Sequence, residues 1–194
     1  VFSIFSIIIH PTNSRSPGQF CKPQLPLTSI DRRKSDVKFD NNNCVLKFSR
    51  WMAPISVALF APGYDMETSL SAIQYVRHCL PESGIIREYV SFSLYFPYQH
   101  LPPVLPKSAT AASNWAFNCS QKAPYDGVDS AKMYKNLHNL TYPINVGRNI
   151  ARKAANTHFI FPSDIELYPS LNVPRQFLEM IANQPNIVNK GNTR

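Results

Sequence analysis

Short apolar runs alternate with amphipathic stretches from about residue 51 onward. Residues 55–60, Ile-Ser-Val-Ala-Leu-Phe, are nearly all apolar and partly β-branched, which predicts a buried strand of a parallel sheet. Ala61, Pro62 and Gly63 then end the run. Apolar residues between 66 and 80 recur at helical spacing, with Asp65 as the expected N-cap. The stretch 54–80 is therefore predicted to be strand, tight turn and helix.

The same alternation continues toward the C-terminus. Residues 90–96 alternate apolar and polar positions, which predicts a half-covered strand, and Trp115 with Phe117 suggests another short strand. Residues 145–155 place their apolar side chains on one helical face, and the aromatic and β-branched residues 158–162 predict a further strand. A last helix is expected to begin near Pro174. This alternation predicts an α/β fold.

Residues 1–53 lack this pattern. The first nine residues, Val-Phe-Ser-Ile-Phe-Ser-Ile-Ile-Ile, are apolar, and residues 12–50 are rich in Pro, Ser, Asn, Lys and Arg. We interpret residues 1–53 as a stem. Residues 1–9 are interpreted as the clipped end of a signal peptide or membrane anchor; the alternatives are a short strand and the mistranslated edge of a gene model. The folded domain is expected to occupy residues 54–194.

Composition and charge narrow the function classes. Of 194 residues, 44% are hydrophobic and 16% are charged, which excludes extensive disorder. The net charge is +8, but residues 1–53 hold eight basic and three acidic side chains, so much of the excess lies outside the patterned region. No basic and stacking-aromatic motif accompanies it, so we expect no nucleic-acid partner. A modest positive field suits an anionic small ligand such as a nucleotide diphosphate.

The cysteines and two sequence triplets bear on the cellular compartment. Cys21, Cys44, Cys79 and Cys119 lack C-x-x-C spacing, which argues against a zinc ribbon. Asn118 and Asn139 each begin an N-glycosylation triplet, Asn-Cys-Ser and Asn-Leu-Thr. With the even cysteine count and the apolar N-terminus, these triplets favour the secretory pathway. Three disulfide pairings remain open, as does the alternative of free buried thiols.

Two acids form the clearest candidate for chemistry. Asp164 and Glu166 flank one residue at the end of the strand predicted over 158–162. Alternate residues of extended chain share a side, where two carboxylates repel each other unless a cation lies between them. Mg²⁺ or Mn²⁺ prefers oxygen ligands and also binds diphosphates. The alternative is a solvated loop.

A polar stripe lies just upstream of these acids. Arg148 and Arg152 are four residues apart on the predicted helix and share a face with Asn145 and Asn149. Arginine can hold a phosphate through two parallel hydrogen bonds, although a solvated helix face explains the pattern equally well. Gly147 in this helix costs about 1 kcal/mol relative to Ala. Close packing or a ligand would account for that residue.

Four segments together resemble glycosyltransferase family 49. They are residues 54–63, 114–119, 142–152 and 159–170, and the resemblance extends over roughly residues 51–184. It implies the N-terminal part of a GT-A fold, a Rossmann-like α/β sheet that binds a UDP-sugar. It also implies a type II membrane protein on the luminal side of the Golgi, which would have a glycan or glycoprotein as its acceptor.

The resemblance also implies roles for individual residues. Asp164 and Glu166 match the metal-binding D-x-D motif of the family, with Glu in place of the usual second Asp, and would hold Mn²⁺ or Mg²⁺ against the UDP diphosphate. The matches to the family's nucleotide-sugar site are the first-strand turn and the polar helix, residues Ala61, Pro62, Gly63, Asn145, Arg148 and Asn149. Arg148 is expected to contact the nucleotide sugar.

The implied reaction is inverting transfer of glucuronic acid from UDP-glucuronate to a xylose-type acceptor in O-mannosyl glycan synthesis. A carboxylate would act as general base, and the metal and basic side chains would stabilise the departing UDP. Only 28 residues follow Glu166. We therefore expect the general base and a late His metal ligand to lie beyond residue 194. The chain would then be a partial gene product, and the missing part of the domain would leave apolar surface exposed. The alternatives are a non-catalytic luminal glycan-binding protein and a transferase that uses another UDP-sugar.

Overall fold

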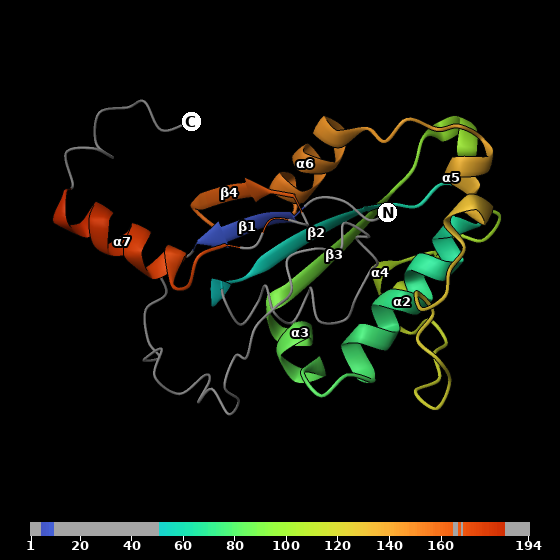
Figure 1. Ribbon diagram of the computed structural model, residues 1–194, viewed down its shortest axis with the longest axis horizontal. Coiled ribbons are helices and arrows are strands. Elements are labelled where there is room, and N and C mark those ends of the chain that lie inside the picture. The colour runs from blue at the N-terminus through green and yellow to red at the C-terminus, as the bar shows by residue number, and fades with distance from the viewer. Residues whose placement is uncertain (1–4, 10–50, 165–166, 168, 185–194) are drawn as a thin grey trace.

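The fold is built on a four-stranded mixed sheet (Figure 1). The computed structural model describes residues 51–164, 167 and 169–184, together with the backbone of residues 5–9. The strand order is β3-β2-β1-β4. The bounds of the strands are β1 Phe5–Ile9, β2 Ile55–Phe60, β3 Val90–Tyr95 and β4 Phe159–Ser163.

Helices connect and cover these strands. The longer ones are α2 Asp65–His78, α6 Ile144–Lys153 and α7 Val173–Asn183. Shorter helices are α3 Ser83–Tyr89, α4 Ala109–Ser113 and α5 Tyr134–Leu137, with 3₁₀ turns at η2 Tyr98–His100 and η3 Ser130–Lys132. None of the helices in the described part is long and apolar enough to cross a membrane.

The predicted strand, turn and helix over residues 54–80 are confirmed. β2 and β3 are parallel, in register from Ile55 opposite Val90 to Phe60 opposite Tyr95, and α2 with α3 forms the crossover between them. All six residues of β2 are buried, as its unbroken apolar character requires for a strand covered on both faces. The mixed arrangement of helices around a partly parallel sheet is an α/β fold.

β1 lies in the middle of the sheet, between β2 and β4. It is antiparallel to both neighbours: Phe5 lies opposite Val57 on one side and opposite Ser163 on the other. Because β2 and β4 are each reversed relative to β1, they run in the same direction. Residues 5–9 fall inside the predicted stem, and the structure shows them as a strand, which was one of the alternatives for that run. The domain boundary itself stays a prediction.

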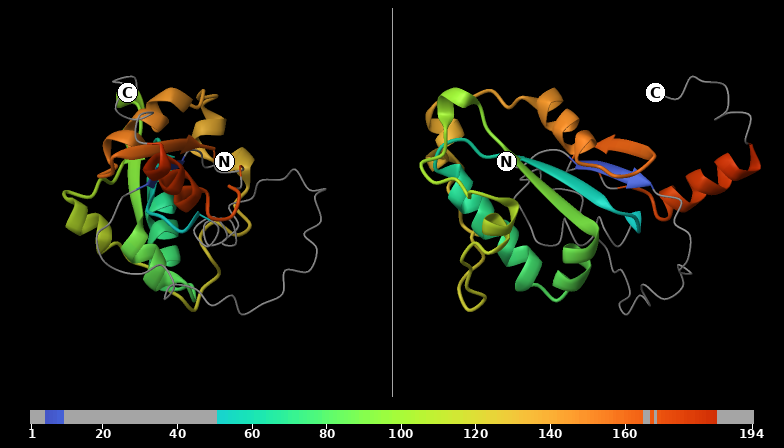
Figure 2. Two further views of the ribbon diagram at one scale, coloured as in Figure 1. Left: turned by 90° about the vertical axis from the view of Figure 1, so that its left-hand side faces the viewer. Right: turned by 180° about the vertical axis from the view of Figure 1, so that it is seen from behind.

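The two faces of β2 support separate cores. Ile55, Val57 and Leu59 pack with residues of α2 and α3 around the fully buried Trp51. Ala58 and Phe60 pack on the other face with Tyr95 and Ala151, and the hydroxyl of Ser56 donates to the Ala151 carbonyl at 2.9 Å. Figure 2 shows α2 and α6 on opposite sides of β2 and β3. Because successive residues of a strand point to opposite faces, one face of β2 packs against α2 and the other against α6.

Two local predictions are wrong. Trp115 and Phe117 lie in irregular chain, without the predicted strand. Asp65 is the first residue of α2 rather than its N-cap, a position taken by Tyr64. The carboxylate of Asp65 is buried and accepts hydrogen bonds from a distant segment, the backbone N–H groups of Tyr134 and Lys135, at 2.8 and 3.2 Å. Spacing along the chain cannot reveal such a long-range partner.

Exposed apolar surface, expected from the sequence, is present near the β4 edge of the sheet. β4 is an edge strand because it pairs only with β1 among the described strands. Several large side chains of β4, the chain after it and α7 are close to half exposed or more: Phe161 47%, Leu167 57%, Leu171 54% and Met180 46%. Apolar groups at a sheet edge favour contact with further protein surface.

Candidate functional site

An ion pair joins α6 to the end of β4. Nη2 of Arg148 lies 2.8 Å from Oδ1 of Asp164, a hydrogen-bonded salt bridge between residues 16 apart in sequence. Both side chains are partly exposed, 40% for Arg148 and 34% for Asp164. The structure therefore brings together one predicted metal-binding acid and the arginine predicted to contact the nucleotide sugar.

Packing of α6 against the sheet positions Arg148. Gly147 and Ala151 are the buried residues of this helix and face the sheet. A Cβ on Gly147 would lie 2.6 Å from Oη of Tyr95 and 3.1 Å from Oη of Tyr142, closer than atoms can approach without displacement. Close packing therefore explains this glycine. Arg148 follows it and is half-buried, whereas the predicted site residues Asn145 and Asn149 on the same helix are exposed.

The turn after β2 is filled by an aromatic side chain. Gly63 has φ +53°, in the left-handed region that favours glycine, and a Cβ there would lie 2.6 Å from Cγ of Tyr134. The Gly63 N–H donates to the His100 carbonyl at 3.0 Å. Tyr134 also stacks on His138, with ring centroids 4.1 Å apart, and its hydroxyl lies 3.1 Å from Nδ1 of His100. Ala61 and Pro62 are buried beside this cluster.

Two buried charged residues, Lys135 and Asp65, lie close to the turn. Lys135 is 6% exposed, and its burial lowers the pKa of its ammonium group below the usual value, while the negative charge of Asp65 opposes that effect. Asp65 anchors the start of α5 through the two backbone hydrogen bonds described above. The contacts tie α2 to α5 and so fix Tyr134 over Gly63.

The sheet sets the spacing between the turn and the ion pair. Val57 and Ser163 lie opposite the same residue of β1, so Asp164 is level with Ala58, three residues short of Ala61. At ~3.3 Å per residue and ~4.8 Å between strands, the two places are about 10 Å apart along the strands and about 10 Å apart across them. Both lie toward the carboxyl ends of parallel-running strands, the usual location of ligand sites in open α/β sheets.

The metal prediction rests partly on residues outside the described chain. Glu166 lies outside the described residues, and within them no three His, Cys, Asp or Glu side chains converge as a metal cluster. Asp164 remains one-third exposed, and its carboxylate is the type of hard oxygen ligand that Mn²⁺ and Mg²⁺ prefer. One acid in the described part, Asp164, is therefore a suitable ligand for such an ion, and it lies beside the guanidinium of Arg148.

The predicted glycosylation residues are both at the surface. Asn118 is exposed, and its side-chain oxygen accepts a hydrogen bond from the Ser120 N–H at 2.9 Å. Asn139 is exposed and has a left-handed backbone, with φ +48°. A disulfide joins Cys79 to Cys119, one of the pairings left open by the sequence.

With this geometry in place, comparison with known proteins defines the class. The α/β domain carries a surface acid and arginine paired at a strand end, and residues 38–194 match the family described as "Glycosyl-transferase for dystroglycan". The chain belongs to this family. The family match begins inside the predicted stem. The resemblance noted in the sequence is thereby confirmed at the level of the family.

One curated relative is similar over much of the chain. It is the Beta-1,4-glucuronyltransferase 1 of Danio rerio, which is 29% identical over 136 residues. The match covers 68% of this chain and 31% of the relative, so the chain spans about a third of the length of the curated relative it matches. No solved structure matches the chain with significance.

Sequence reasoning missed the aromatic cluster at the turn. The cluster combines residues that are far from Gly63 in the sequence and follow no regular interval from it: His100, Tyr134 and His138. Only the fold brings them together. Gly63 itself was the available signal, because glycine after a strand often marks a close approach of another group. Its neighbour here is a protein side chain.

Proposed function

We propose that this chain is part of a UDP-sugar glycosyltransferase with a GT-A fold. It transfers glucuronic acid from UDP-glucuronate to a xylose-type glycan acceptor, with inversion, in O-mannosyl glycan synthesis. Membership in a family described as acting on dystroglycan supports the proposal, as does similarity to a protein named as a glucuronyltransferase. The described part contributes the parallel β2 and β3 and the parallel-running β4 that such a nucleotide site uses.

The ion pair between Arg148 and Asp164 carries this proposal. Asp164, which is predicted to bind the metal, and Arg148, which is predicted to contact the nucleotide sugar, lie 2.8 Å apart in the structure. Arginine has five N–H donors, and one contact to Asp164 leaves others for a diphosphate at the exposed side of the guanidinium. Asp164, with Glu166, would hold Mn²⁺ or Mg²⁺, which when bound supplies Lewis-acid stabilisation of the departing UDP. The contact with Asp164 holds the guanidinium in place before the nucleotide binds.

We further propose a luminal location, with the chain carried by a type II membrane protein of the Golgi. The Cys79–Cys119 disulfide supports this location, because structural disulfides persist in oxidising compartments. The two N-glycosylation triplets, each of which begins with an exposed Asn, agree with it. No nucleic-acid partner is part of the proposal.

Calorimetric titration of the full chain with UDP, with and without Mn²⁺, tests the nucleotide site. We expect Mn²⁺ to tighten UDP binding at least tenfold, Asp164→Asn to abolish that gain, and Arg148→Ala to weaken binding at least fivefold. Lys153→Ala is the matched control, because it removes one positive charge from an exposed position of the same helix. Absence of UDP binding under both conditions, or an equal loss in the Lys153 variant, contradicts the proposal.

Competition between nucleotide sugars tests the donor. UDP-glucuronate is expected to displace UDP at least tenfold more effectively than UDP-xylose or UDP-N-acetylglucosamine. Preference for either of the latter assigns another donor to the same site. Binding of a xylose-terminated glycan without any UDP binding would instead identify a non-catalytic glycan-binding protein.

A further inference from the structure

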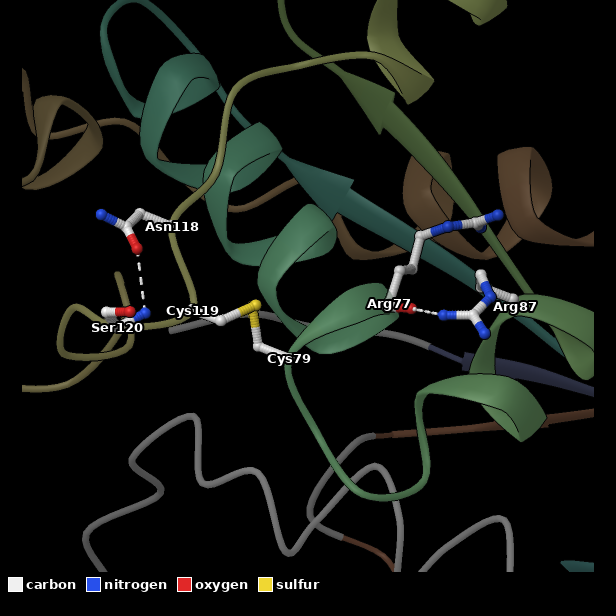
Figure 3. Close-up of a disulfide and its surroundings, with 6 residues drawn as sticks. All are labelled: Arg77, Cys79, Arg87, Asn118, Cys119 and Ser120. Carbon is white, nitrogen blue, oxygen red and sulfur yellow. Dashed lines mark hydrogen bonds between the residues drawn. A yellow bond between two sulfur atoms is a disulfide. The ribbon is translucent and has the colours of Figure 1, made fainter.

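The disulfide and one glycosylation triplet share a residue. Cys119 is the middle residue of Asn118-Cys119-Ser120, and it is bonded to Cys79, immediately after α2 (Figure 3). The bond closes a loop over 40 residues and holds the two Cα atoms 5.1 Å apart. Any enzyme that modifies Asn118 must therefore bind a triplet whose middle residue is covalently attached to the end of a helix.

The helix end itself is firmly held. The Cys79 N–H donates to the Tyr75 carbonyl at 2.8 Å. Figure 3 shows a second hydrogen bond, in which Nη1 of Arg87 donates to the Arg77 carbonyl at 2.6 Å. Just before the triplet, the ring of Phe117 stacks on His78 with centroids 4.6 Å apart. The disulfide thus anchors the triplet to a fixed element rather than to a loose loop.

Asn118 and Cys119 point to opposite sides of the loop. In Figure 3 the side chain of Asn118 lies on the side away from the two sulfur atoms, next to Ser120. Asn118 and Ser120 are both exposed. A glycan on Asn118 would therefore extend into solvent and leave the path between Cys119 and Cys79 open. If the disulfide forms first, however, a transferase that must surround the triplet meets a covalent bond at the middle residue, Cys119.

We propose that Asn118 is an N-glycosylation site whose use is limited by closure of the Cys79–Cys119 disulfide. The glycan is added only while Cys119 is a free thiol, and disulfide closure afterwards stops the addition. This inference rests on the luminal location proposed above and is independent of the proposed transferase activity. The glycan occupancy of Asn118 then shows which of the two reactions, glycosylation or disulfide formation, occurred first.

Both reactions balance with ordinary reagents of the secretory pathway. In glycosylation, the amide nitrogen of Asn118 bonds to C1 of a lipid-diphosphate oligosaccharide. The bond from C1 to the phosphate oxygen breaks, the lipid diphosphate leaves, and the amide loses one proton to a base of the transferase. In disulfide formation, Cys79 and Cys119 exchange with the disulfide of a protein oxidant. That oxidant accepts two electrons and two protons and becomes a dithiol.

Asn139 provides an internal comparison in the same chain. Its triplet, Asn139-Leu140-Thr141, contains no cysteine. Leu140 packs against the core beneath α6, so folding also restrains this triplet, although without any covalent bond. A change that acts only through the disulfide should alter the occupancy of Asn118 and leave that of Asn139 unchanged.

The test is site-resolved glycan occupancy in the full chain carried into microsomes by a cleavable secretion signal, which supplies the luminal location. Peptide N-glycosidase in heavy-oxygen water marks each occupied Asn, and mass spectrometry reads Asn118 and Asn139 separately. Cys79→Ser frees Cys119 without changing the triplet, and we expect it to raise the Asn118 occupancy at least threefold. Cys44→Ser is the matched control, since it removes a cysteine and keeps this disulfide.

A reducing agent added during translocation of the unaltered chain keeps Cys119 as a thiol without any substitution. It should reproduce the rise at Asn118. Equal occupancy of Asn118 in all these samples, or no glycan there in any of them, overturns the proposal. An equal rise at Asn139 also overturns it, because that result indicates general misfolding rather than a local effect of the bond.

Discussion

Replacement of Gly63 by Ala tests whether the turn after β2 is shaped by packing. An added Cβ would lie 2.5 Å from Cε2 and 2.6 Å from Cγ of Tyr134, whereas ordinary carbon contacts begin near 3.4 Å. The ring has little room to shift, because His100 and His138 hold it on two sides. Overpacking of this kind costs about 1–3 kcal/mol, and the left-handed backbone adds about 1 kcal/mol for any L-residue with a Cβ.

We therefore expect Gly63→Ala to lower the free energy of unfolding by roughly 2–4 kcal/mol. In a Tyr134→Ala background the ring is absent, and only the backbone part, about 1 kcal/mol, should remain. Urea unfolding followed by the fluorescence of the buried Trp51 measures both values. The double-mutant comparison isolates the contact between the two residues from their separate effects.

Gly84→Ala is the matched control. Gly84 lies in α3, and nothing lies within 4 Å of the position that its Cβ would occupy. A helical glycine in open space should gain up to about 1 kcal/mol when replaced by Ala. If Gly63→Ala costs the same with and without Tyr134, the packing argument fails. If it leaves stability unchanged but weakens UDP binding, the turn is a ligand site.

Two further predictions concern α6 and its neighbours. A double-mutant cycle of Arg148→Ala and Asp164→Ala should give a coupling of about 1 kcal/mol in unfolding free energy, since the pair is well aligned but partly exposed to solvent; strictly additive losses would show that the ion pair is absent. Burial raises the pKa of Tyr95 far above its ordinary value of 10.0. The contribution of this side chain to the free energy of unfolding is therefore complete below pH ~10 and is lost at higher pH, as the tyrosine ionises in the unfolded state. Tyr95→Phe should therefore flatten the alkaline loss of stability above pH ~10 in urea titrations, and an unchanged slope contradicts this assignment.

Local patterns predicted the secondary structure around β2 and α6 well. Ile55–Phe60 is apolar throughout because both faces of β2 are covered, and this run is visible in the sequence alone. Residues 145–155 show a clear apolar face, and α6 spans Ile144–Lys153. β2 is apolar because it is buried on both faces, and α6 is apolar on the one face that it buries. In both elements this local signal is stronger than any competing interaction.

Features that depend on distant partners could not be predicted. Asp65 is a good N-cap residue by type, but its carboxylate is used by the backbone of α5, 69 residues later. The apolar run at residues 5–9 is consistent with an anchor or a strand, and only pairing with Val57 and Ser163 reveals the strand. The aromatic character of Trp115 and Phe117 reflects contacts with other parts of the fold, such as the stacking of Phe117 on His78.

The position of β1 has a direct consequence for the candidate site. Without a strand between them, β2 and β4 would be neighbours, ~4.8 Å apart; with β1 inserted, their separation is about 10 Å. The turn at Gly63 and the acid at Asp164 therefore cannot both contact one compact group such as a single phosphate. Because the ring of Tyr134 fills the turn, we propose the ion pair of Arg148 and Asp164, and not the turn, as the place of the diphosphate. Arg148 reaches Asp164 from α6, which packs across β1 and β2, and in the proposed function it contacts the diphosphate. Arg148→Ala should therefore weaken UDP more than uridine, and an equal effect on both would separate Arg148 from the diphosphate.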